Sequence, residues 1–177
     1  MIEKIQHIVQ SFAVSVVTAL GFSAASANYL YVFLISMVPI VELRGAIPIA
    51  TALGLDPVVS YIIAILGNVL PVPFILLFIT PFCNLLKKTK LFRWFPEWLE
   101  RKVQKNEAKV TKYKNLGLFI FVAIPLPGTG AWTGALVASF IGYKFRDAFL
   151  AISGGVLSAG LIMSVGSWLV KLLLGLF

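Results

Sequence analysis

Ionisable side chains are scarce in this sequence. Only 12% of its 177 residues are charged, and it contains seven acidic residues, one histidine and one cysteine. A serine hydrolase needs a histidine partner for its serine, but the one histidine, His7, lies at the extreme N-terminus. The single cysteine, Cys83, excludes an internal disulfide. No His, Cys, Asp and Glu residues have the spacing of a metal site, and no GxxxxGK[ST] loop is present to bind a nucleotide. We therefore expect no metal and no cofactor.

Charge is absent altogether from three long stretches of the chain. Residues 57–86, 116–143 and 148–170 contain no charged side chain. Hydrophobic residues make up 59% of the chain, and the mean hydropathy is +0.95. Because a helix crosses a bilayer with about 20 apolar residues, the sequence predicts an all-α integral membrane protein. We expect it to cross the plasma membrane several times.

The basic residues are concentrated in one segment. Ten of the 15 lysines and arginines lie between Lys87 and Lys114, opposed by three glutamates. Such a block can bind nucleic acid, but here it lies between apolar segments, so the positive-inside rule favours a cytoplasmic loop and no nucleic-acid partner. From Pro96 onward the pattern predicts an amphipathic helix that lies on anionic lipid, with a solvated helix as the alternative. Its apolar face would consist of Leu99, Val103, Val110 and Tyr113.

A cytoplasmic 87–114 segment implies a re-entrant hairpin in the first half of the chain. Residues 57–86 then cross from outside to inside, and a first helix at about 5–22 starts from a cytoplasmic N-terminus. Both ends of residues 29–55 therefore lie outside, although each of their apolar pieces is too short to span a membrane. Non-helical backbone at membrane depth is tolerated where it is buried in protein or lines a cavity. We expect the turn at Glu42 to Pro48, where Gly45 and Pro48 would permit it.

The second half of the chain repeats this plan in the opposite direction. Residues 116–142 contain two short apolar pieces separated by a break at 125–130, and Lys144 and Arg146 place the following segment in the cytoplasm. The spacing of Gly54 and Gly67 recurs 88 residues later, and residues 44–46 align with 129–131 at an offset of 85. We therefore predict a single membrane domain, 1–177, with an inverted-topology repeat. Repeat 1 covers about 1–86 and repeat 2 about 115–177.

The two hairpin tips are the predicted substrate site. A charged group at membrane depth costs roughly 2.5–3.5 kcal/mol on insertion scales, and the guanidinium of Arg44 suits phosphate or carboxylate. Glycine-rich backbone at a helix start also favours anions, through the N–H groups of residues 128–130. For Glu42 and Arg44 the alternative is a static contact between them. For Asn68 we expect an interhelical hydrogen bond, with substrate binding as the alternative. The candidate substrate-binding residues are Glu42, Arg44, Gly45, Asn68, Pro125, Pro127, Gly128, Thr129, Gly130, Trp132 and Thr133.

Two motifs carry a family resemblance over essentially the whole chain. ELRGAIP at 42–48, followed by PLPGTGAWTGALVA at 125–138, resembles the small multidrug export proteins. More remotely, the layout is similar to the DedA and related SNARE-associated-type membrane proteins, which pair two re-entrant hairpins that bear acidic and basic residues. That similarity implies a role in moving polyprenyl-phosphate or another phospholipid across a membrane. The second hairpin departs from the pattern, because no arginine lies between Gly117 and Tyr143.

These observations favour a transporter over other functions. The leading hypothesis is an ion- or proton-coupled transporter or flippase for an amphiphilic, anionic substrate such as a lipid phosphate. The alternative is a small-molecule exporter in which Glu42 binds a cationic drug, although Arg44 would repel cations. An intramembrane enzyme and a scaffold for membrane complexes are the less favoured classes. The expected partners are membrane lipids and the substrate, together with a second copy of the chain that would cover the re-entrant elements.

Overall fold

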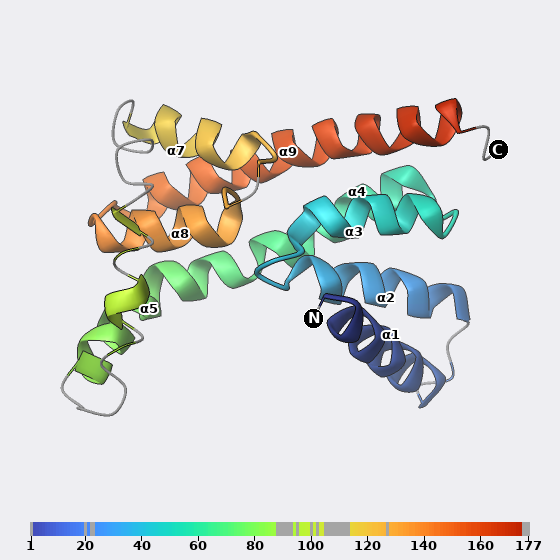
Figure 1. The fold of residues 1–177 in the computed structure, drawn as a ribbon, viewed down its shortest axis with the longest axis horizontal. Helices are drawn as coiled ribbons and strands as arrows, with labels where there is room; N and C mark the ends of the chain where they lie inside the picture. The colour runs from blue at the N-terminus through green and yellow to red at the C-terminus, as the bar shows by residue number, and fades with distance from the viewer. Residues whose placement is uncertain are drawn as a thin grey trace. The chain divides into compact units, whose positions relative to one another are not determined.

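The computed structural model describes residues 2–19, 21, 24–87, 94, 96–99, 101, 103–104, 114–126 and 128–174 (Figure 1). All regular secondary structure within these residues is helical, so the all-α prediction is confirmed. The helices with described bounds are α1 (Ile2–Ala19), α2 (Ala24–Ser36), α3 (Glu42–Ala52), α4 (Pro57–Val69), α5 (Pro71–Lys87), α7 (Lys114–Ala123), α8 (Ala131–Phe140) and α9 (Phe145–Leu173).

Two helical segments of the described chain are long and apolar enough to cross a membrane. They are Pro57–Leu86, with 30 residues, and Phe145–Leu173, with 29 residues. The first comprises α4 and most of α5, which are separated at Leu70 because Pro71 has no N–H to donate to the preceding turn. The segment expected to span at 5–22 forms α1, which is not among them, since the polar residues Glu3, Lys4 and His7 lie in its first half.

The chain divides into two compact units. Unit 1 consists of residues 1–69 and 158–177, and unit 2 of residues 70–157. The long helix α9 therefore begins in unit 2 and ends in unit 1 (Figure 1). Each unit contains one of the two expected helical hairpins, α2–α3 in unit 1 and α7–α8 in unit 2.

In unit 1, α2 packs against α1, α3 and α4, and α3 packs along α4 (Figure 1). The closest backbone approach is at Gly67 of α4. A Cβ atom on this residue would lie 2.4 Å from the carbonyl oxygen of Phe33 and 2.1 Å from Oγ of Ser36. Gly160 of α9 lies against the ring of Tyr61 in a similar way: a Cβ atom on Gly160 would lie 2.8 Å from Cε2 of Tyr61. Glycine thus lets three helices of this unit approach closely.

Unit 2 uses the same type of contact. A Cβ on Gly155 of α9 would lie 2.9 Å from the carbonyl oxygen of Phe119 in α7. Gly155 follows Gly67 by 88 residues, and Phe119 follows Phe33 by 86. The hydroxyl groups of Thr80 and Ser139 hydrogen-bond to each other at 2.7 Å and join α5 to α8.

The second helix of each hairpin also ends with the same backbone motif. The glycine after the C-cap has a positive φ, 67° at Gly54 and 74° at Gly142, a conformation that glycine adopts at little cost. The N–H of the next residue then bonds back across the glycine, from Leu55 to the oxygen of Ala50 (3.1 Å) and from Tyr143 to the oxygen of Ala138 (2.9 Å). The glycine, the donor residue and the acceptor residue of unit 1 are each followed by their counterpart in unit 2 at an offset of 88 residues.

The position of the first turn differs from the expectation. Glu42 to Pro48 was expected to form the turn, and this is wrong: α2 ends at Ser36, the turn occupies residues 37–41, and α3 already begins at Glu42. Pro39 and the positive φ of Glu42 produce the change of direction, whereas Pro48 lies inside α3. In the second hairpin the break between α7 and α8 at 124–130 matches the prediction closely.

Most of the basic segment 87–114 lies outside the described residues. Of its expected apolar face, Leu99 and Val103 are described and both are buried, whereas Val110 and Tyr113 are not described. The amphipathic cytoplasmic helix therefore stays a prediction.

The contact at Gly67 should be sensitive to a single methyl group. We expect Gly67→Ala to lower the free energy of unfolding by roughly 1–3 kcal/mol, since the new Cβ meets a backbone carbonyl that cannot rotate away. Gly166→Ala in α9 is the control: nothing lies within 4 Å of its Cβ position, so it should gain up to about 1 kcal/mol of helix propensity. Apparent melting temperatures in one detergent compare the two, and a Gly67→Ala protein that melts at or above the control would contradict the contact.

Candidate functional site

Glu42 occupies an unusual backbone position at the start of α3. It is the non-glycine residue of the described chain with a positive φ, 51°, and its N–H donates to the carbonyl oxygen of Val38 at 2.9 Å. A left-handed conformation costs a residue with a Cβ roughly 1–2 kcal/mol. The side chain is also 96% buried, with a relative exposure of 4%. Both features act against glutamate at this position.

The corresponding place in unit 2 has the residue that the backbone favours. Gly130 lies 88 residues after Glu42 and caps the start of α8 with a φ of 121°. Glycine adopts such an angle without steric cost. Local backbone geometry therefore does not explain a glutamate at position 42, and strain of this kind is typical of functional sites.

Arg44 lies in the same turn of α3 and interacts electrostatically with the carboxylate of Glu42. It is half-buried. The N-terminus of a helix carries partial positive charge, which favours an acid and disfavours a base, so Glu42 offsets the cost of placing Arg44 here. Because Pro48 has no N–H, the carbonyl of Arg44 cannot receive the helical bond from residue 48. A Cβ on Gly45 would lie 2.2 Å from Cγ1 of Val41, so a larger residue here would require the side chain of Val41 to move.

Asn68 lies at the same end of unit 1. Residues 53–56 join α3 to α4, and the two helices pack along each other, so the last turn of α4 lies beside the first turn of α3. Asn68 is 1% exposed, and no hydrogen-bond partner of its Oδ1 is found within the described residues. An unsatisfied buried acceptor of this kind costs about 1–3 kcal/mol. The expected interhelical hydrogen bond is therefore not formed by this oxygen, which is open to a donor from water or a ligand.

Ser36 belongs to this polar group and was not identified from the sequence. It is fully buried at the end of α2, next to Gly67, and its Oγ donates to the carbonyl oxygen of Phe33 at 2.7 Å. The available signal was its place as the last residue of an apolar run, directly before the turn.

The tip in unit 2 is organised by Thr129. Its hydroxyl lies within hydrogen-bond distance of the carbonyl oxygens of Ile124 (2.9 Å) and Leu126 (2.8 Å). Its N–H donates to Leu126 at 3.2 Å. This N–H was expected to be an anion donor, but it is already used inside the loop. Gly128, with a φ of 82°, allows the chain to turn there.

The remaining candidates of unit 2 lie around the first turn of α8. Gly130 is the N-cap residue of α8 and has no side chain that could accept a hydrogen bond from the helix. As in any α-helix, the first N–H groups of α8 have no acceptor within the helix. Thr133 is buried, while Pro125 and Trp132 are half-buried. Pro127 lies outside the described residues.

The two groups differ in chemistry. Unit 1 combines a carboxylate, a guanidinium and a buried amide oxygen, which can bind a proton, an anion and a hydrogen-bond donor. Unit 2 offers backbone N–H groups at a helix start. No group of three or more His, Cys, Asp or Glu side chains in the described part of the chain could hold a metal ion.

The chain was compared with protein families, curated proteins and solved structures. A family model described as "Putative small multi-drug export protein" matches residues 42–162, which is more than half of the chain and begins at Glu42. No curated protein and no solved structure matches the chain.

The interaction of Glu42 with Arg44 predicts non-additive effects on stability. Arg44→Ala should lower the free energy of unfolding by about 1–3 kcal/mol, because it leaves a buried carboxylate without its neighbouring charge. Adding Glu42→Gln should restore most of this loss, since a neutral amide is less costly to bury than a carboxylate. Thermal unfolding of the two single variants and the double variant tests this coupling, and losses that simply add would contradict it.

Proposed function

Because the chain belongs to the small multi-drug export protein family, we propose that it is a secondary transporter for an amphiphilic, anionic substrate. The family and the two membrane-length helices support a membrane transporter. The sequence contains no phosphate-binding loop for ATP, which favours an ion gradient or the membrane potential as the energy source.

The architecture that we propose is a pair of re-entrant hairpins inserted from opposite faces of the plasma membrane. The helices of the hairpins have 13, 11, 10 and 10 residues, and at 1.5 Å per residue none reaches across a hydrocarbon core of about 30 Å. The recurrence of caps and glycine contacts at an offset of 88 supports an inverted repeat. The concentration of lysine and arginine in 87–114 favours a cytoplasmic segment and N-terminus, and a second copy of the chain would cover the exposed sides of the hairpins.

The observation that carries the function is the buried, left-handed Glu42 beside Arg44. In the proposed mechanism, the anionic group of the substrate and the carboxylate of Glu42 compete for the guanidinium of Arg44. Protonation of Glu42 removes its negative charge and so favours binding of the anion, whereas deprotonation restores the interaction with Arg44 and favours release. Backbone N–H groups at the start of α8 would be the second anion-binding element.

An exporter of lipophilic cations is the second candidate, favoured by the wording of the family description. Glu42 would then bind the cation directly, in competition with a proton. The positive charge of Arg44 in the same turn of α3 argues against this candidate, because it raises the cost of a second cation nearby.

Binding at different pH values tests the proposal and separates the two candidates. For the protein in lipid nanodiscs, we expect a long-chain lipid phosphate to bind more tightly as the pH falls and Glu42 becomes protonated. Glu42→Gln should lose the part of this pH dependence that comes from Glu42 and keep only the part that comes from the titration of the phosphate itself. Arg44→Ala should lose about tenfold to a hundredfold in affinity, the worth of a charged hydrogen bond, and Arg44→Lys should lose less because it retains the charge.

The matched control is Arg146→Ala, which removes an exposed arginine outside the hairpins and should leave binding unchanged. A lipophilic phosphonium cation that binds Arg44→Ala better than the wild type, while the lipid phosphate does not bind, would support the cation exporter. The proposal is wrong if the folded Glu42→Gln, Arg44→Ala double variant still transports substrate at the normal rate.

A further inference from the structure

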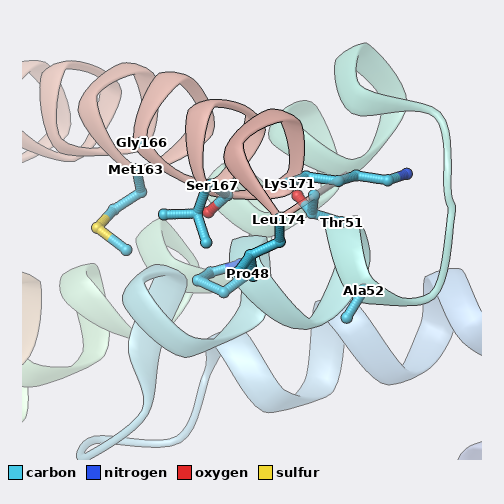
Figure 2. A pocket seen from close by; sticks show the side chains of 9 residues that line it. Pro48, Thr51, Ala52, Met163, Gly166, Ser167, Lys171 and Leu174 are labelled. Atoms are coloured by element: carbon cyan, nitrogen blue, oxygen red, sulfur yellow. The ribbon is translucent and has the colours of Figure 1, made fainter. Parts of the chain in front are cut away.

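Two adjoining cavities lie in unit 1, at the end of α3 that is opposite to Glu42. One is a groove of about 710 Å³ between α3 and the second half of α9, and the other is a smaller cavity of about 270 Å³ at the start of α4. Thr51 and Lys171 line both of them. Figure 2 shows Pro48, Thr51 and Ala52 on one side of the groove and Met163, Gly166 and Lys171 on the α9 side.

The groove is suited to a hydrocarbon chain. Its walls are largely apolar, with Pro48 and Ala52 from α3 and Met163 and Val170 from α9. Gly166 contributes no side chain, and nothing lies within 4 Å of the position of its Cβ. A cavity of this size falls in the range of about 300–1,000 Å³ that is typical of ligand sites.

The smaller cavity is lined by more polar groups than the groove. Ser60 of α4 and Ser164 of α9 line it, and neither hydroxyl oxygen has a hydrogen-bond partner among the residues that the structure describes. Ser60 is 3% exposed, so bulk water does not satisfy its hydroxyl. Buried polar groups are rarely left without a partner, so water or a polar ligand is expected to bind these two hydroxyls.

Opposite charges lie at this smaller cavity. Asp56 and Lys171 both line it, as does Trp168. One carboxylate oxygen of Asp56 accepts the N–H of Val59 at 2.9 Å and caps α4. Each carboxylate oxygen can accept more than one hydrogen bond, so this cap leaves capacity for a cationic ligand group. Tryptophan and lysine near a helix end are typical of the membrane interface.

We propose that the two cavities together bind one phospholipid whose headgroup carries both a phosphate and an ammonium group. The acyl chain lies in the groove beside Gly166. The phosphate accepts hydrogen bonds from Lys171, Ser60 and Ser164, and the ammonium group lies at Asp56. A headgroup with one net negative charge matches this lining less well, because Asp56 repels it while Lys171 attracts it. This lipid is a retained ligand and is distinct from the transported substrate, so the proposal does not depend on Glu42 and Arg44.

Native mass spectrometry of the full-length protein tests this site. After removal of lipid in detergent, one phosphatidylethanolamine per chain should rebind at least about tenfold more tightly than phosphatidylglycerol, the difference that 1.4 kcal/mol produces. Gly166→Leu fills the groove and should abolish rebinding. Val165→Leu is the matched control, because Val165 is 65% exposed and does not line the groove, and it should bind as the wild type does.

A second pair of variants keeps the test independent of side-chain size. Ser60→Ala and Ser164→Ala each remove one oxygen atom, so they should fold. Each should weaken phosphatidylethanolamine binding several-fold, while the lipid-free protein melts at an equal or higher temperature because an unpaired buried hydroxyl is gone. Three outcomes would overturn the proposal. The first is equal retention of both lipids, and the second is a Gly166→Leu protein that binds phosphatidylethanolamine as well as the Val165→Leu control does. The third outcome is a lipid-free dimer that dissociates in Gly166→Leu, which would mean that a second copy of the chain fills the groove.

Discussion

Residue 67 is a glycine, and its lack of a side chain allows α4 to pack directly against the backbone carbonyl of Phe33 in α2. The packing of the rest of unit 1 depends on this close approach. It places the last turn of α4 beside the end of α2, where the chain turns through residues 37–41 into α3. In an apolar medium each backbone N–H and C=O group must find a hydrogen-bond partner within the protein. The unpaired backbone groups at a helix end are therefore tolerated there only where neighbouring helices pack closely around them. Gly155 makes the equivalent contact against Phe119 in unit 2.

The two hairpins share several backbone features, and they differ in the residue that has a positive φ at the start of the second helix. In unit 2 this residue is Gly130, which precedes α8, and in unit 1 it is Glu42, the first residue of α3. Glycine would relieve the strain at position 42, so the glutamate there is consistent with the role that we propose for its carboxylate. The same short helix α3 then carries Thr51 at its other end, beside the cavities that we assign to a phospholipid. The proposed substrate site and the proposed lipid site thus lie at opposite ends of one helix.

Charge-free runs and paired short apolar segments were enough to predict an all-helical membrane protein with hairpins near 29–55 and 116–142. The exact turn was not predictable, because Gly45 and Pro48 are strong breakers in water, yet packing holds both inside α3. Glu42 and Arg44 stood out as charges in an apolar run, whereas Ser36, Ser60 and Ser164 became visible only through their burial.

Labelling of single cysteines from each side of the membrane tests the opposed arrangement of the hairpins most directly. The native Cys83 is 1% exposed and can be replaced by alanine, and Asp56→Cys and Lys144→Cys each introduce a thiol at an exposed position beside one hairpin. With a membrane-impermeant maleimide, the account predicts that Asp56→Cys is labelled only from outside the cell and Lys144→Cys only from inside. Labelling of both positions from the same face would contradict it.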